Sequence, residues 1–167
     1  MNQKMQALAT LTIVVGFTLS GCEAIPPRQE ADLCQTISEA RTHVFERVSK
    51  SSLSDLRIVL ASFECLDGGD LEDAYISVGE GLFKSPSRFV PILISRRVTA
   101  HDLASIATML SAVFVDEPCK SESELTRRKG LIVREGVFLP LRSSLLPAID
   151  DSLARQTKWC RATRGTM

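Results

Sequence analysis

Apolar side chains recur at three- and four-residue steps along most of the chain, which is the spacing of one face of an amphipathic helix. The first such segment covers residues 30–49, and its apolar positions are Leu33, Ile37, Ala40, Val44 and Val48. Lys50-Ser51-Ser52 interrupts the pattern, which resumes over residues 53–66. Gly68-Gly69 is expected to stop this second helix, because glycine commonly follows a helix end. The two segments predict a helical hairpin that turns near residue 50.

The helical pattern continues through the middle of the chain. Asp70 is a suitable N-cap for a helix over residues 70–84. Ser85-Pro86 begins another helix, since proline is favoured in a first turn, and Pro91 is expected to shorten or kink it. Thr99 or His101 is predicted to open the next helix, which reaches residue 114.

Two further helices, over residues 122–138 and 141–158, predict a second hairpin that turns near Pro140. No stretch shows the sustained apolar and polar alternation of a strand. The predicted fold class is therefore all-α, with six or seven helices in antiparallel hairpins that form one domain over residues 30–167.

Short segments recur at offsets of about 50 residues, which is a weak sign of internal repetition. Leu53-Ser54-Asp55-Leu56 is matched by Ala100-His101-Asp102-Leu103, and Glu80-Gly81-Leu82-Phe83 by Glu135-Gly136-Val137-Phe138. Paired helices in units of this length resemble HEAT or armadillo repeats, and the resemblance covers roughly residues 53–151. It implies an α-solenoid, and an irregular helical bundle is the alternative.

Composition and charge narrow the functional classes. The chain is 44% hydrophobic and 24% charged, which is typical of a globular domain, and its 20 basic residues balance 20 acidic ones. This balance gives no electrostatic footprint for nucleic acid or for an anionic membrane surface. An aromatic content of 5% argues against a base-stacking or sugar-stacking platform.

The N-terminal segment has the features of a secretory leader. Lys4 provides one positive charge, and residues 7–19 form an apolar stretch too short to cross the roughly 30 Å hydrocarbon core of a bilayer. The stretch ends in Leu19-Ser20-Gly21-Cys22, which resembles the lipobox of bacterial lipoprotein precursors. The resemblance implies removal of residues 1–21 and attachment of lipid to Cys22, with several acyl chains for stable anchoring. The alternatives are an ordinary secretory signal with a chance cysteine and an uncleaved anchor helix.

The residues after Cys22 bear on location. Glu23 is a weaker cue than the aspartate that resembles an inner-membrane retention signal in enteric bacteria, so we expect the outer membrane, with the protein facing the periplasm. Residues 22–29, which include Pro26 and Pro27, are predicted to be the lipidated cysteine and a short extended tether.

Export would place the remaining four cysteines in an oxidising compartment. Residues 34 and 65 are equidistant from the first predicted turn, and residues 119 and 160 from the second. We therefore predict the disulfides Cys34–Cys65 and Cys119–Cys160. A zinc site is the alternative, but no Cys-x-x-Cys pair is present.

The residue types that usually carry catalysis are sparse. His43 and His101 are the two histidines, and each is better explained by a polar helix position than by a catalytic or metal-binding role. The chain has no Gly-x-Ser-x-Gly motif, and Gly79-Glu80-Gly81 lacks the strand and third glycine of a phosphate loop. We interpret these glycines as a point of close helix packing, and we expect no cofactor.

Two charge clusters remain. The acidic cluster around Gly68-Gly69 lacks the ligand pattern of a calcium-binding EF-hand. We interpret its carboxylates as helix caps, and an acidic docking patch is the alternative; the members are Asp67, Asp70, Glu72 and Asp73. The basic cluster covers residues 127–129, and the spacing of Glu124 and Arg128 predicts a solvated helix face.

Three functions follow as hypotheses. The first is a non-catalytic, lipid-anchored module that binds another envelope protein. The second is an immunity lipoprotein that neutralises a toxin delivered into the periplasm. The third, which the sequence favours least, is an enzyme acting on envelope lipid or peptidoglycan.

Overall fold

The computed structural model describes residues 27–115 and 117–164. The predicted leader, the lipidation site Cys22 and residues 23–26 of the tether lie outside this part of the chain. Every regular element within it is helical: α1 Pro27–Ser49, α2 Leu53–Ser62, α3 Gly68–Lys84, α4 Pro86–Ser95, α5 Ala100–Thr108, α6 Ala112–Val115, α7 Pro118–Arg134, the 3₁₀ helix η1 Gly136–Leu141, and α8 Arg142–Arg164. The predicted all-α class is confirmed. None of these helices is long and apolar enough to cross a membrane.

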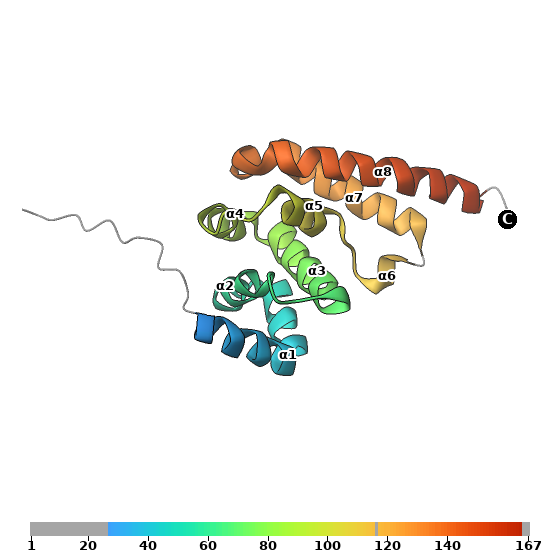
Figure 1. Ribbon diagram of the computed structural model, residues 1–167. Coiled ribbons are helices and arrows are strands. Elements are labelled where there is room, and N and C mark those ends of the chain that lie inside the picture. The colour runs from blue at the N-terminus through green and yellow to red at the C-terminus, as the bar shows by residue number, and fades with distance from the viewer. Residues whose placement is uncertain (1–26, 116, 165–167) are drawn as a thin grey trace, which may run out of the picture.

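The helices form successive tiers (Figure 1). α1 packs against α2 and α3 at one end of the molecule, α3 also contacts α4 and α5, and α5 packs against α8. α7 and α8 lie side by side along the opposite end and are joined through η1. All the helices except α6 contribute to one apolar core, whose fully buried members include Val48, Leu56, Val78, Leu82, Phe89, Ile106, Ile132, Phe138 and Leu145.

Two glycines let α3 approach its neighbours closely. A Cβ on Gly79 would lie 2.4 Å from the carbonyl oxygen of Ile106 in α5. A Cβ on Gly81 would lie 2.6 Å from the carbonyl oxygen of Val48 in α1. The interpretation of Gly79-Glu80-Gly81 as a packing motif is confirmed, because any larger side chain at either position would push the helices apart.

α2 and α5 begin with the same capping arrangement. The Ser52 side chain accepts a hydrogen bond from the Asp55 backbone N–H, and the Thr99 side chain accepts one from that of Asp102. Each hydroxyl also donates to the aspartate side chain three residues later. The two N-caps therefore satisfy backbone donors that the first turn would otherwise leave without a partner.

The helix count differs from the predicted six or seven, since the described residues form eight α-helices and η1. The helix predicted to reach residue 114 ends at Thr108, and Met109 adopts extended backbone with φ −70° and ψ 134°. The carbonyls of Ile106, Ala107 and Met109 accept hydrogen bonds from a side chain of α7. The end of α5 therefore coincides with a contact between segments distant in the sequence. Neither glycine nor proline stands at this helix end in the sequence.

Several boundaries also differ from the prediction, and those of the second hairpin are among them, since α7 covers Pro118–Arg134 and α8 covers Arg142–Arg164. α1 begins at Pro27, so residues 27–29 of the predicted tether are helical, with proline in the favoured first position. α2 ends at Ser62 rather than at residue 66. Gly68 and Gly69 start α3 instead of ending α2, and Asp67 rather than Asp70 is the flanking N-cap residue.

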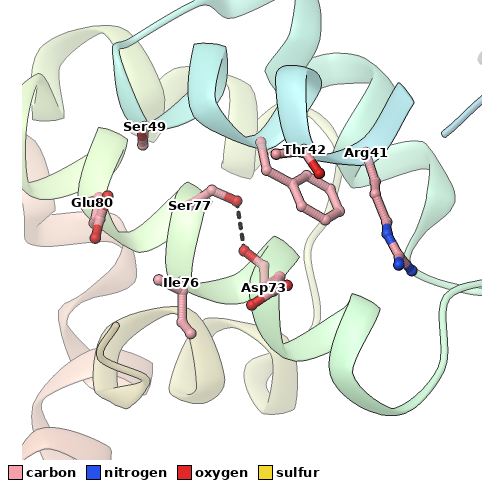
Figure 2. Close-up of a pocket in the computed structure, with 8 residues that line it drawn as sticks. Arg41, Thr42, Ser49, Asp73, Ile76, Ser77 and Glu80 are labelled. Atoms are coloured by element: carbon pink, nitrogen blue, oxygen red, sulfur yellow. Dashed lines mark hydrogen bonds between the residues drawn. The ribbon is translucent and has the colours of Figure 1, made fainter. Parts of the chain in front are cut away.

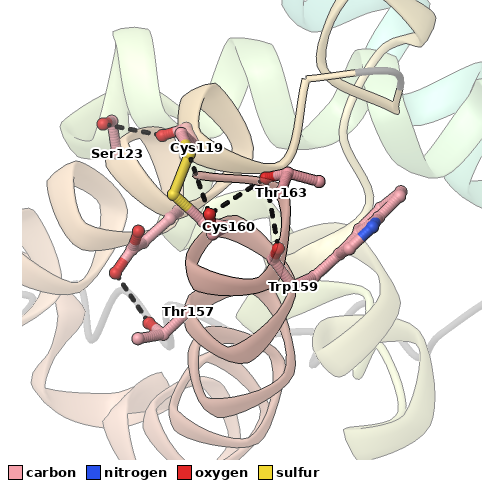
Figure 3. Close-up of a disulfide and its surroundings, with 7 residues drawn as sticks. Cys119, Ser123, Thr157, Trp159, Cys160 and Thr163 are labelled. Atoms are coloured by element: carbon pink, nitrogen blue, oxygen red, sulfur yellow. Dashed lines mark hydrogen bonds between the residues drawn. A yellow bond between two sulfur atoms is a disulfide. The ribbon is translucent and has the colours of Figure 1, made fainter. Parts of the chain in front are cut away.

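The Cys119–Cys160 disulfide is confirmed (Figure 3). It joins the start of α7 to the end of α8 with a Cα–Cα distance of 4.8 Å, at the end of the hairpin away from η1. Cys65 is also in disulfide form, but the side chain of Cys34 lies outside those described, so the Cys34–Cys65 pairing stays a prediction.

Candidate interaction site

An open groove of about 220 Å³ runs between α1 and α3 (Figure 2). Each helix contributes residues at three- and four-residue steps, which places them on one face of that helix. The groove is lined by Arg41, Thr42, Phe45 and Ser49 from α1 and by Asp73, Ile76, Ser77 and Glu80 from α3.

The groove combines an apolar floor with polar walls. Phe45 from α1 is 7% exposed, and Ile76 from α3 is partly buried. The Ser77 hydroxyl donates to the backbone carbonyl of Asp73 at 2.7 Å, so its proton is held within α3. No histidine lines the groove. This chemistry suits the recognition of a side chain better than the activation of a nucleophile.

One charged side chain of the groove has an ion-pair partner, and two others have none among the described side chains. Arg41 forms an ion pair with Asp70, and this hydrogen bond raises the pKa of Arg41 above its usual value. Asp73 and Glu80 are exposed and form no ion pair with a described side chain. The α3 wall therefore presents two carboxylates to an incoming group.

The predicted acidic cluster is divided by the start of α3. Asp70 reaches α1 through Arg41, and Asp73 lines the groove. Asp67 is exposed and occupies the N-cap position of α3, but its side chain makes no capping hydrogen bond. Glu72 is exposed and does not line the groove. The sequence missed Arg41, Phe45 and Glu80, because their spacing indicates a helix face without showing which helix covers it.

The basic segment of α7 is only partly a solvated face. Glu124 pairs with Arg128, as the spacing predicts, and also with the exposed Arg127. Arg128, by contrast, is 2% exposed, and the prediction that it is solvated is wrong. Its guanidinium bonds to Glu124 at 3.0 Å and lies 4.9 Å from the centre of the Phe83 ring.

Burial lowers the pKa of Arg128, although its hydrogen bond with Glu124 opposes this shift. The Nη1 group donates to the carbonyls of Ala107 and Met109 at 3.0 and 3.1 Å, at the C-terminal end of α5. Cations are favoured at helix C-termini, where carbonyls lack intrahelical partners. Arg128 therefore ties α7 to α5 and is a structural residue.

The two histidines lie on different helices, and neither lines the groove. His43 is exposed on α1, and His101 is exposed in the first turn of α5. The Asp102 carboxylate beside His101 accepts hydrogen bonds from Tyr75 and Thr99, each at 2.6 Å. Burial and the hydrogen bond to Asp102 raise the pKa of Tyr75. Within the described part of the chain, no three His, Cys, Asp or Glu side chains converge as metal ligands would.

A scan against protein-family models finds no match for this chain, and neither do searches of curated proteins and of solved structures.

Proposed function

We propose that this protein is a lipid-anchored helical module of the bacterial outer membrane that faces the periplasm and binds another envelope protein. The observation that carries the proposal is the groove between α1 and α3, with Phe45 at its floor and the carboxylates of Asp73 and Glu80 on one wall. Charge complementarity favours a polypeptide segment with a lysine or arginine side chain as the occupant. An aliphatic stem would pack on Phe45 while the charged end reached the carboxylates.

The anchor would hold the start of α1 close to the membrane. Helix α1 begins at Pro27, five residues after Cys22, and five extended residues span at most about 18 Å. The start of α1 would therefore stay near the bilayer surface, where membrane-bound partners are accessible. The tiered helical hairpins also support the proposal, since solenoids of the HEAT type use extended surfaces for binding.

Lipid attachment has a direct test. Replacement of Cys22 by serine should abolish incorporation of a palmitate analogue and move the protein from the membrane fraction to the soluble fraction. Labelling and fractionation that did not change in Cys22→Ser would contradict the anchor and leave the groove untouched.

The groove is tested by photocrosslinking in the anchored, oxidised protein. A photoreactive residue at Thr42, which is exposed in the groove, should crosslink to one partner, whereas the same residue at Lys158 on α8 should not. Equal crosslinking from both positions would refute a specific site.

Charge-neutralised variants then test recognition. The Asp73→Asn/Glu80→Gln variant should bind the identified partner at least tenfold more weakly, because each charge-assisted hydrogen bond contributes about 1.5–3 kcal/mol. Glu64→Gln/Glu135→Gln removes the same charge elsewhere and should bind normally. Identification of a periplasm-delivered toxin as the partner would specify the function as immunity. A loss of function in His43→Gln/His101→Gln with the fold intact would favour an enzyme instead.

A further inference from the structure

A second cavity lies between α5, α7 and α8, and we propose that it binds a single pyranose sugar ring. Its volume is about 190 Å³, which is below the roughly 300–1,000 Å³ of sites for drug-sized ligands and suits one ring. Its lining includes Trp159, which precedes Cys160 in the sequence, and Figure 3 shows the Trp159 side chain extending outward from α8. The cavity is lined by Thr108, Leu110, Ser121, Leu125, Ser152, Arg155, Gln156 and Trp159.

Several lining groups can accept hydrogen bonds. The Gln156 Oε1 atom is buried and has no partner among the described groups. The hydroxyl of Thr108 donates to the Ala104 carbonyl at 2.8 Å, and that of Ser121 to the Phe114 carbonyl at 2.6 Å. Because these protons are already committed, the hydroxyl oxygens retain only acceptor capacity. An occupant of the cavity must therefore donate hydrogen bonds.

The Arg155 side chain supplies donors to the same cavity. It is 70% exposed, its Nη2 group donates to the Ser152 hydroxyl at 3.0 Å, and its Nη1 group lies 4.0 Å from the exposed Asp151 carboxylate. A guanidinium has five N–H donors, so others remain for a ligand. An ammonium group would donate but would meet the positive charge of Arg155, and a carboxylate could not donate to Gln156. Neutral hydroxyl groups meet both requirements, because each can donate and accept.

The apolar lining favours a ring over an open-chain polyol. Trp159 is 47% exposed, and Leu125 is 1% exposed. An indole offers a flat apolar face together with one N–H donor, which suits the C–H face of a pyranose flanked by hydroxyls. The low aromatic content of the chain argues against a platform of several aromatic rings, whereas one ring needs only one indole.

Trp159 is the only tryptophan in the sequence, so its fluorescence reports on this site alone. The full lipidated protein in a detergent without sugar headgroups is titrated with glucose and N-acetylglucosamine. We expect a saturable change in emission at millimolar concentrations. Glycerol, which has hydroxyls but no ring, and N-acetylglutamine amide, which represents a peptide, should give no saturable change.

Matched variants place the binding in the cavity. Gln156→Leu should bind the sugar about fivefold more weakly, the factor that corresponds to one lost hydrogen bond. Arg155→Gln, at a more exposed position, should also bind more weakly and covers the case in which Gln156→Leu does not fold. Lys158→Gln changes an exposed residue of α8 outside the lining and should bind normally.

Saturation by a pyranose together with weaker binding in the folded variants supports the proposal. The absence of a saturable change with either sugar overturns it. Saturation by the peptide amide alone would instead assign the cavity to a polypeptide. Normal binding in folded Gln156→Leu and Arg155→Gln would place the sugar elsewhere. All these outcomes are independent of the groove between α1 and α3.

Discussion

Replacement of Arg128 by methionine tests how a buried cation stabilises this fold. Methionine fills a similar space without a charge, so the substitution removes the polar contacts and keeps much of the packing. The Nη1 group makes two well-formed bonds to α5 carbonyls, at 3.0 and 3.1 Å. Nε forms a third contact, with Glu124, at 3.0 Å.

The contacts give the magnitude. Hydrogen bonds that involve a charged group contribute about 1.5–3 kcal/mol each, and the contact with the Phe83 ring adds about 1 kcal/mol. Burial of the Arg128 charge carries a desolvation penalty, and the methionine variant avoids this penalty, which offsets part of the sum. We therefore expect Arg128→Met to lower the free energy of unfolding by about 3–5 kcal/mol, the usual cost of breaking a buried pair.

Urea unfolding followed by circular dichroism measures this difference. Arg127→Met is the matched control, because Arg127 also pairs with Glu124 but is exposed. This variant should lower the free energy of unfolding by less than about 1 kcal/mol. If the two variants lost equal stability, Arg128 would behave as a surface residue and the buried contact between α7 and α5 would be refuted.

Three further predictions concern stability. Removal of the disulfide in Cys119→Ser/Cys160→Ser should lower the free energy of unfolding by about 4 kcal/mol in the chain-entropy model, since the bond closes a loop with a sequence separation of 41. A variant whose urea unfolding matched that of the parent protein would contradict this prediction. Gly79→Ala should lower the free energy of unfolding by about 1–3 kcal/mol, because the added Cβ would lie 2.4 Å from a carbonyl oxygen of α5. An unchanged thermal midpoint would show that α3 and α5 can separate without loss of stability. The hydrogen bond from Arg47 lowers the pKa of Asp55, so its stabilising contribution is present above the ordinary aspartate pKa of about 3.9 and is lost as pH falls through the lowered folded-state value. Asp55→Asn should therefore lose less stability than the parent between about pH 4 and pH 2 in urea titrations, and equal losses would rule out this linkage.

Local chemistry made several elements predictable from the sequence. Thr99 was one of the two predicted openings of a helix, and Ser85-Pro86 begins another, because capping and proline preferences act within a few residues. The Cys119–Cys160 bond was predictable because two helices joined by a short turn bring equidistant residues level with each other.

Contacts between distant segments set the limits of that prediction. Glu124 and Arg128 have the spacing of a surface ion pair, and nothing in the sequence shows that α5 and α3 cover Arg128. The end of α5 at Thr108 was missed for the same reason, since the carbonyls of Ile106 and Ala107 accept hydrogen bonds from Arg128, which lies 22 and 21 residues further along the chain. Of the residues that line the candidate groove, the predicted acidic cluster contained only Asp73, and the sequence gave no sign of the facing residues of α1.

The Cys119–Cys160 disulfide has a topological consequence. The backbone joins α7 to α8 through η1, and the disulfide joins their other ends, so residues 119–160 form a closed covalent ring. A protease that cuts η1, where Leu139 is 62% exposed, would open this ring without releasing a fragment. The nicked protein would keep its mass apart from one added water and would separate into two pieces only after reduction. Such a molecule can lose backbone continuity and still hold both helices against the core.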